Sequence, residues 1–361
     1  MNFNSPVLKF TLGLFALFFA LWLFRNTVPM EPTEKGLSDT PVKLELRGKT
    51  MGTTYHVVLS ELPAGQTLAK LQNEIDQRLQ EINQVMSTYL PDSELSRFNQ
   101  SESTSWEPVS SELFALVERA EQLSKITKGA FDITVGPAVN LWHFGPQKTT
   151  QDRTVPSDDQ IEQVQQVIGY THLHLDSETS ALKKDFAELY LDLSAIAKGY
   201  AVDEIVTLIQ KHKAKIGCMV EIGGEIGTAG KRPDGSSWRI GIQAPDAAPG
   251  TLTSTLELTN LSMATSGDYF NFFVVDGKRY SHTIDPHTAR PVTHNLTSSV
   301  VVTKSCADAD AWATALLVLG PNQAYDIARQ HDVAVMLFER TDSGITSRQT
   351  EAFKQSVAKE Q

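Results

Sequence analysis

Residues 216–227 read Ile-Gly-Cys-Met-Val-Glu-Ile-Gly-Gly-Glu-Ile-Gly, and this stretch is the first indication of antiparallel β-structure. Two strand-like apolar runs meet at a glycine pair, which predicts a bulged β-hairpin. Other short runs rich in β-formers are found at residues 173–175, 189–193, 238–243, 252–258, 272–275 and 300–302. Most connections between these runs are too short for a crossover helix, so the sheets are expected to be largely antiparallel.

Helical patterns occupy other parts of the chain. Apolar residues recur at helical spacing over residues 68–86, and again over 113–126 between a Ser110-Ser111 cap and Gly129. Helices are also expected over 199–212 and over 307–319 before Gly320-Pro321, with a β-hairpin over 44–59 and a last strand over 333–338. The combination predicts an α+β fold of largely antiparallel sheets with flanking helices.

The N-terminus is unlike the rest of the chain. Residues 10–24 form an uncharged, strongly apolar stretch, and no small-x-small cleavage site follows it. We expect residues 1–25 to be an uncleaved signal anchor, with a cleaved signal peptide as the alternative. Either segment would place the remaining chain outside the cytoplasm. We therefore expect a protein of the bacterial inner membrane whose folded domain is periplasmic.

The chain beyond this segment divides by composition. Residues 26–41 hold three prolines without apolar periodicity, which predicts a linker. We expect one folded domain over residues 42–345 and a polar tail over 346–361.

Composition also excludes several classes of protein. With 41% hydrophobic and 21% charged residues, the chain of 361 residues has ordinary globular composition. Its net charge of -11, without a compensating Lys/Arg run, argues against nucleic-acid binding. Cys218 and Cys306 form no C-x-x-C pair, so neither thiolate zinc nor a disulfide framework is indicated, and both are expected to be buried.

A candidate cation site lies in the predicted helix 307–319. Asp310 and Thr314 are four residues apart, so their oxygen atoms share one face of the helix. Together with nearby carbonyl oxygens they would suit Mg²⁺. The structural alternative is an aspartate favoured near a helix start and a packed threonine.

A candidate acid/base pair lies in residues 281–286, Ser-His-Thr-Ile-Asp-Pro. His282 stands three residues before Asp285 and a proline turn, where the two side chains could pair. His287 and His294 follow, but their spacing matches no zinc motif.

A strand-to-helix junction is expected over residues 191–200, Leu-Asp-Leu-Ser-Ala-Ile-Ala-Lys-Gly-Tyr. Such junctions commonly contact phosphate or metal, which makes Asp192 a candidate. Lys198 lies at the end of the helix that its charge does not favour, which indicates a role toward a ligand. Two familiar nucleotide signatures are excluded, because 221–227 lacks the G-x-G-x-x-G spacing, and Glu225 and Arg232 break a Walker pattern around Gly230-Lys231.

Taken together, these segments resemble the ApbE family, the FAD:protein FMN transferases. The matching blocks are Met-Gly-Thr-Thr-Tyr at 51–55, Met-Ser-Thr-Tyr at 86–89, Ser-Glu-Leu-Ser-Arg-Phe-Asn at 93–99, Gly-Ala-Phe-Asp-Ile-Thr-Val-Gly-Pro at 129–137, Glu-Ile-Gly-Gly-Glu at 221–225, Ala-Thr-Ser-Gly-Asp-Tyr at 264–269, and segments 191–203, 281–286 and 309–314. They follow the family's order from Gly48 to Gly320, and the ordered set is specific although each block is modest. The resemblance implies a T-fold-like architecture.

The resemblance also implies site residues. Contacts to FAD, the substrate, are implied for Met51, Tyr89, Ala130, Phe131, Asp132, Asp192, Lys198 and Ile284. A Mg²⁺ site is implied from Asp310, Thr314 and the backbone oxygens of Ala195 and Ala313. His282 is the candidate general base, with Asp285 as its alternative.

The implied reaction transfers FMN from FAD to a threonine hydroxyl of an acceptor protein and releases AMP. The implied acceptors are subunits of membrane redox complexes, such as the Na⁺-pumping NADH:quinone oxidoreductase and Rnf complexes. A Mg²⁺-dependent FAD pyrophosphatase would use the same residues, and a non-catalytic flavin-binding protein of the envelope would retain intact FAD. No cysteine ends the apolar segment, so lipid attachment there, common in the family, is excluded.

Overall fold

The computed structural model describes residues 44–146, 154–212, 216–243, 245, 252–269 and 271–358. The chain divides into two units, residues 1–42 and 43–361. The expected anchor and linker lie outside the described residues. Within the described ranges, no helix has both the length and the apolar character needed to span a bilayer.

The main sheet of the second unit has eight strands, and each neighbouring pair is antiparallel. Its order is β1 (Leu44–Thr50), β2 (Thr53–Leu59), β6 (Cys218–Ile222), β7 (Glu225–Ala229), β10 (Ser262–Gly267), β15 (Leu296–Thr303), β16 (Ala334–Thr341) and β17 (Gly344–Gln349). The prediction of an α+β fold with largely antiparallel sheets is therefore confirmed.

The hairpin at residues 216–227 is formed by β6 and β7. Ile222 pairs with Glu225, so Gly223 and Gly224 alone make the turn, with φ angles of 61° and 107°. Residues other than glycine rarely adopt this left-handed region. Since a two-residue glycine turn closes the hairpin without an extra residue, the hairpin was correctly predicted but the bulge was wrong.

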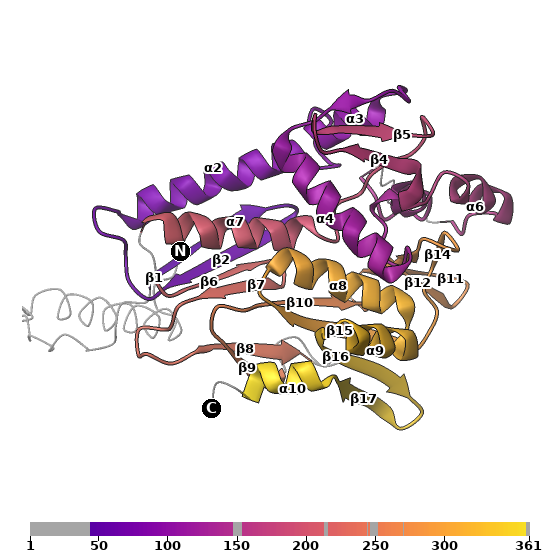
Figure 1. Ribbon diagram of the computed structural model, residues 1–361. Helices are drawn as coiled ribbons and strands as arrows, with labels where there is room; N and C mark the ends of the chain where they lie inside the picture. Colours follow the sequence, from indigo (N-terminus) through magenta and orange to yellow (C-terminus); the bar gives the residue numbers. More distant parts are fainter. Residues whose placement is uncertain are drawn as a thin grey trace, which may run out of the picture. The chain divides into compact units, whose positions relative to one another are not determined.

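Helices cover one face of the sheet (Figure 1). They are α2 (Leu68–Met86), α4 (Ser111–Thr127), α7 (Ala197–His212), α8 (Cys306–Leu319) and α9 (Pro321–Gln330). Helix α7 packs on β6 and β7, and α8 packs on β10 and β15. The four predicted helices are thus confirmed, including the Ser110 cap, whose hydroxyl accepts a hydrogen bond from the Leu113 backbone.

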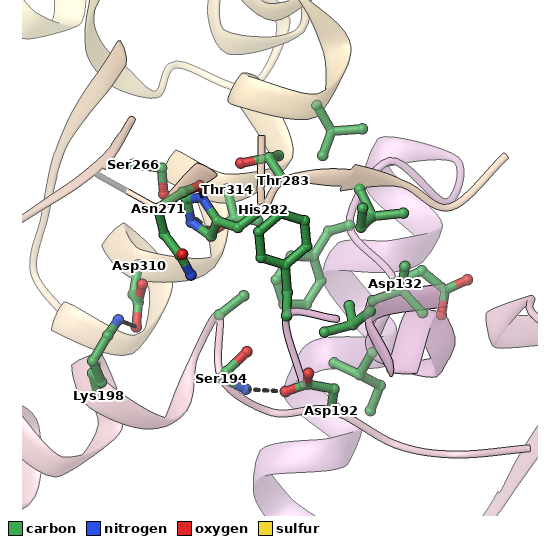
Figure 2. A pocket seen from close by; sticks show the side chains of 18 of the residues that line it. Asp132, Asp192, Ser194, Lys198, Ser266, Asn271, His282, Thr283, Asp310 and Thr314 are labelled. Atoms are coloured by element: carbon green, nitrogen blue, oxygen red, sulfur yellow. Dashed lines mark hydrogen bonds and ion pairs between the residues drawn. The ribbon is translucent and has the colours of Figure 1, made fainter. Parts of the chain in front are cut away.

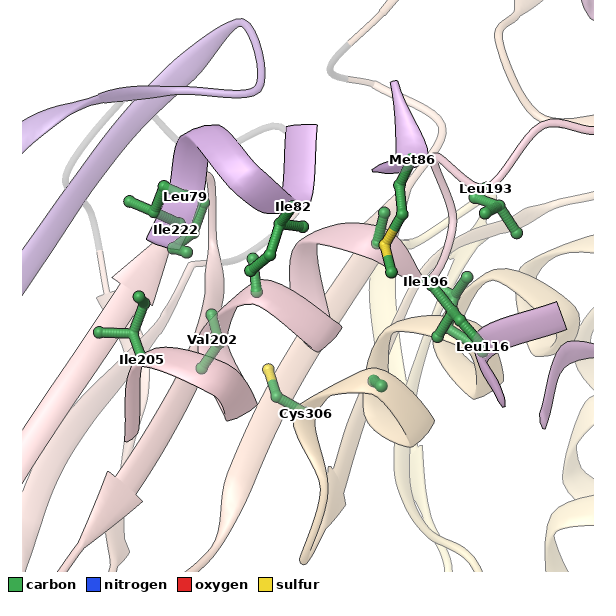
Figure 3. Close-up of a cluster of buried hydrophobic side chains, with 14 of the residues drawn as sticks. Leu79, Ile82, Met86, Leu116, Leu193, Ile196, Val202, Ile205, Ile222 and Cys306 are labelled. Atoms are coloured by element: carbon green, nitrogen blue, oxygen red, sulfur yellow. The ribbon is translucent and has the colours of Figure 1, made fainter. Parts of the chain in front are cut away.

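The core beneath α2 shows why these helices stack on the sheet (Figure 3). Leu79, Ile82 and Met86 are spaced along one face of α2 and point toward α7. On α7, Val202 and Ile205 belong to the same buried cluster. Each such side chain stabilises the fold by about 1.5–3 kcal/mol on burial. Both cysteines are buried as predicted.

A second layer covers the opposite face of the sheet. It consists of β8 (Trp238–Gln243), β9 (Leu252–Leu258) and α10 (Glu351–Ala358). Because side chains alternate along a strand, Val301 packs toward the helices while Val300 and Val302 pack toward this second layer. Both faces of the central strand β15 are therefore buried.

The prediction of a polar tail over residues 346–361 was wrong for residues 346–358, the part that the structure describes. Strand β17 pairs with β16, and α10 buries Phe353, which is only 1% exposed. Most side chains of β17 are exposed at the sheet edge, so its sequence carries no apolar alternation. One buried aromatic side chain in a polar helix was too weak a pattern to indicate α10.

The remaining described elements are smaller. They are the three-stranded sheet of β3 (Glu107–Pro108), β5 (Ala181–Lys184) and β4 (Leu173–Asp176), the hairpins β11 (Phe272–Val275) with β12 (Lys278–Ser281) and β13 (Ile284–Asp285) with β14 (Arg290–Pro291), and the helices α3 (Glu94–Gln100), η1 (Ile133–Val135), α5 (Gly136–Leu141), α6 (Asp158–Gln165) and η2 (Tyr170–His172).

One predicted strand, residues 189–193, is absent from the described elements. Leu189, Leu191 and Leu193 are buried, as their apolar alternation suggested. The side chain of Asn99, however, takes the place of a partner strand, with its Nδ2 donating to Leu191 O at 2.9 Å and its Oδ1 accepting from Leu191 N at 2.8 Å. The segment was predicted correctly as buried and wrongly as a strand.

Candidate active site

A cavity of about 530 Å³ lies where several loops meet one face of α8 (Figure 2). Its walls come from the loop that precedes α7, the β6–β7 turn, the segment after β12, and the region around η1 and α5. These segments are far apart in the sequence, and the sheet and α8 bring them together.

Helix α8 supplies the oxygen-rich wall of the cavity. Asp310 and Thr314 both line it, as their spacing on one helical face predicted. The helix approaches α7 closely, since a Cβ atom at Gly199 would lie 2.3 Å from the carbonyl oxygen of Cys306. This contact lets the Gly199 backbone donate to Asp310 Oδ2 at 3.1 Å, while Thr314 Oγ1 lies 3.1 Å from Ser266 Oγ.

The ammonium group of Lys198 lies between two buried carboxylates. Its Nζ atom is 2.9 Å from Glu225 Oε1 and 3.6 Å from Asp310 Oδ2. Burial lowers the pKa of Lys198, but the charges of Asp310 and Glu225 outweigh it and raise the pKa overall. Burial raises the pKa of both Glu225 and Asp310, although the Lys198 charge acts against each shift.

His282 lines the cavity beside Asn271 and follows directly after β12 (Figure 2). The carbonyl oxygen of Asn271 accepts hydrogen bonds from the His282 backbone and from Nδ1, each at 3.0 Å. A carbonyl at Nδ1 selects the tautomer with a proton on Nδ1, so the lone pair lies on Nε2. This is the form of histidine that can accept a proton.

Asp285 lies elsewhere. Its carboxylate bonds to His287 Nδ1 at 3.1 Å and to Thr288 Oγ1 at 3.2 Å, and it is not among the residues that line the cavity. Within the described part of the chain, the expected pair of His282 and Asp285 therefore does not form. The β13–β14 turn directs the carboxylate toward its own following residues.

Two further carboxylates at the cavity accept hydrogen bonds from nearby backbone N–H groups. Asp132 Oδ1 accepts from Thr134 N at 2.8 Å and Oδ2 accepts from Tyr170 N at 2.7 Å. Burial raises the pKa of Asp132, although these hydrogen bonds oppose the shift. Asp192 Oδ1 accepts from Ser194 N at 2.8 Å, which shapes the loop before α7.

The remaining wall is apolar. Ala130, Phe131, Val139, Phe144 and Ile284 line it together with the exposed ring of Tyr89. The cavity thus combines a charged end, built by Lys198, Glu225 and Asp310, with an apolar end that suits a flat ring system.

Comparison with known proteins decides the family. The model of the ApbE family matches residues 51–337, most of the folded unit. The chain belongs to the ApbE family. It is 41% identical over 317 residues to the FAD:protein FMN transferase of Vibrio cholerae, covering 88% of this chain and 93% of that protein. With the Escherichia coli protein of the same name it shares 37% identity, covering 87% and 89% of the two chains.

Solved ApbE structures share the fold. The flavin transferase ApbE from Vibrio cholerae superposes with a TM-score of 0.80 at 41% identity, over 87% of this chain and 98% of that one. The apo form of the flavinyl transferase ApbE from Pseudomonas stutzeri gives 0.79 at 37% identity, over 87% and 96%. The chain is therefore an enzyme of the transferase class.

The structure places most residues that the ApbE resemblance implied for a flavin at the cavity. They are Tyr89, Ala130, Phe131, Asp132, Asp192, Lys198 and Ile284. Met51 is the exception, because it lies in the β1–β2 turn with φ of 48° and packs against the core. Lys198 contacts carboxylates of the protein itself, which sequence reasoning did not anticipate.

The predicted metal ligands fit Mg²⁺ only as a mixed donor set. Ala195, Asp310 and Thr314 line the cavity, whereas Ala313 is buried behind it and its carbonyl oxygen accepts from Ser299 Oγ at 2.5 Å. No group of three His, Cys, Asp or Glu side chains among the described residues could hold a metal. One buried carboxylate, a hydroxyl and a carbonyl suit an ion that completes its shell with water or phosphate oxygens.

Sequence reasoning missed several polar residues of the cavity, three of which matter for its geometry. Glu225, Ser266 and Asn271 all line it. Glu225 had a usable signal, because it is a carboxylate at the start of an otherwise apolar strand, directly after the glycine turn. Asn271 acts through its backbone carbonyl, which no residue pattern reveals.

Proposed function

We propose that the chain is a Mg²⁺-dependent FAD:protein FMN transferase, which moves FMN from FAD to a threonine hydroxyl of an acceptor protein and releases AMP. The observation that carries the proposal is the cavity itself. It holds Asp310 and Thr314, the Lys198 ammonium and His282 around one space with an apolar end. The names of the relatives support transfer of FMN from FAD to a protein.

In this proposal each group has a separate task. The apolar wall with Tyr89 and Phe131 binds the flavin ring, and Lys198 attracts the pyrophosphate. When bound at Asp310 and Thr314, Mg²⁺ neutralises charge on the phosphoryl oxygens. His282 Nε2 accepts the threonine proton as the hydroxyl oxygen bonds to the phosphorus on the FMN side, and the bond from that phosphorus to the AMP oxygen breaks.

Mass spectrometry of an acceptor domain tests the reaction. The chain from residue 42 onward is incubated with FAD, Mg²⁺ and acceptor, with a parallel sample that contains EDTA. We expect an FMN adduct on one acceptor threonine and AMP in solution only with Mg²⁺. FMN and AMP without an adduct would show a pyrophosphatase instead. Intact FAD in both samples would show a flavin-binding protein without transferase activity.

Tyr89 is expected to contribute to FAD affinity and little to stability. Its side chain lines the cavity but is 62% exposed, so it contributes little to the packing of the core. Tyr89→Ala should weaken FAD binding up to about tenfold, the scale of one aromatic contact of about 0.5–1.5 kcal/mol. Trp106→Ala removes a ring that is 48% exposed and outside this cavity, and should leave affinity unchanged. Equal FAD affinities for both variants in a titration would contradict the assignment.

We further propose that residues 1–25 anchor the enzyme in the bacterial inner membrane, with its acceptors among membrane redox complexes such as the Na⁺-pumping NADH:quinone oxidoreductase or Rnf. The support is the uninterrupted apolar stretch 10–24 without a cleavage site. We expect the full chain to remain with membranes after a salt wash and to keep its N-terminus. A soluble periplasmic product that starts near residue 26 would show cleavage and refute the anchor.

A further inference from the structure

We propose that Glu225 is a positioning residue, which keeps the Lys198 ammonium off Asp310 so that a divalent cation can bind there. The proposal rests on the Mg²⁺-dependent function proposed above and adds a residue that no part of that mechanism uses.

The geometry puts Lys198 within reach of two carboxylates but favours one. Nζ donates a hydrogen bond to Glu225 Oε1 at 2.9 Å, whereas Asp310 Oδ2 is 3.6 Å away, beyond hydrogen-bond distance. Glu225 and Asp310 are 4% and 3% exposed, so water screens neither interaction strongly. The ammonium is thus held mainly by Glu225, in a place from which it also stabilises Asp310.

Glu225 has no other evident structural task. Its second oxygen, Oε2, is buried and has no hydrogen-bond partner among the described residues. A buried carboxylate with an unsatisfied oxygen destabilises a fold, so its presence here calls for a functional explanation. The two-residue turn of Gly223 and Gly224 fixes where Glu225 begins β7, and therefore where Lys198 is held.

A cation at Asp310 and the ammonium of Lys198 compete for the same charge. Asp310 is the one anionic group in the expected ligand set, so a bound divalent ion repels Lys198 from it. Glu225 offers the ammonium a second anionic partner that is already in contact. Without Glu225, Lys198 would rest on Asp310 alone and would have to be displaced each time a cation binds.

A double-mutant cycle on cation affinity tests this coupling. Mn²⁺ is titrated into the parental chain, Glu225→Gln, Lys198→Met and the double variant, and free Mn²⁺ is measured by electron paramagnetic resonance without FAD. We expect Glu225→Gln to weaken Mn²⁺ binding about tenfold and Lys198→Met to bind at least as tightly as the parent. In the Lys198→Met background, Glu225→Gln should cause no further loss, because Glu225 acts through Lys198.

Several outcomes would overturn the proposal. An equal loss in both backgrounds would show that Glu225 acts on the cation directly, as a ligand or as a nearby charge. Unchanged affinity in Glu225→Gln, or weaker binding in Lys198→Met, would show that Lys198 does not compete. Thermal unfolding of each variant shows whether it folds. The Mn²⁺ affinity of Lys198→Met tests the proposal even if Glu225→Gln fails to fold. A parental chain that transfers FMN yet binds no Mn²⁺ would refute this inference and leave the transfer reaction itself intact.

Discussion

Asp310→Ala is expected to lower FMN transfer by about 10³-fold, the largest effect of any single substitution in the cavity. Asp310 is the one carboxylate in the expected ligand set, and it is 3% exposed at the cavity wall. Metal-ion stabilisation of transferred phosphoryl charge contributes several kcal/mol, and each 1.36 kcal/mol changes a rate tenfold. Initial rates of acceptor labelling over a range of Mg²⁺ concentrations measure the effect.

Excess Mg²⁺ should restore little of this activity, because the lost charge cannot be supplied by the remaining hydroxyl and carbonyl oxygens. Asp308→Ala is the matched control on the same helix. Its carboxylate pairs with Arg119 at 2.6 Å and is 45% exposed, so the variant should keep nearly parental activity and lose at most about 1 kcal/mol of stability. Full recovery of Asp310→Ala at high Mg²⁺ would show that the cation is held mainly by other groups.

The helices and strands that could be predicted from the sequence are those that a local residue pattern specifies. Helix α2 has apolar residues at helical spacing, and α8 is rich in alanine and leucine and ends before Gly320-Pro321, so the positions of both followed from local sequence. The β6–β7 hairpin followed from its glycine pair. Residues 189–193 show the limit of local patterns. Their alternation is that of a strand, but Asn99, 92 positions before Leu191, makes the hydrogen bonds that a neighbouring strand would make.

The residues of the site also divide into those that local spacing predicted and those that only the structure reveals. Asp310 and Thr314 share one helical turn, and their place at the cavity followed from spacing. The contact of Lys198 with Glu225 joins a helix to a strand 27 positions later, and nothing in either local pattern reveals it. Local spacing also misled, since His282 and Asp285 are close in sequence yet the β13–β14 turn sends Asp285 to His287.

His282→Ala is expected to slow FMN transfer by about 10²-fold or more while FAD and Mg²⁺ still bind. The Asn271 carbonyl accepts from Nδ1 at 3.0 Å, so the lone pair of the imidazole lies on Nε2, the atom that would accept the proton of the attacking hydroxyl. Loss of a general base typically lowers a rate by 10²–10⁴-fold, about 3 kcal/mol at the lower end. Single-turnover labelling of the acceptor at saturating FAD separates this effect on the chemical step from any effect on binding.

His287→Ala provides the matched control, because this imidazole is 56% exposed, pairs with Asp285 at 3.1 Å and does not line the cavity. Its rate should stay within a few-fold of the parent. Asp285→Asn should behave alike, since that carboxylate is engaged with His287 and Thr288 rather than with substrate. A parental rate for His282→Ala, together with a large loss for Asp285→Asn, would assign proton removal to Asp285 and would require the β13–β14 turn to rearrange when FAD binds. A large loss confined to His282→Ala, with FAD affinity unchanged, is the result that the Asn271–His282 geometry supports.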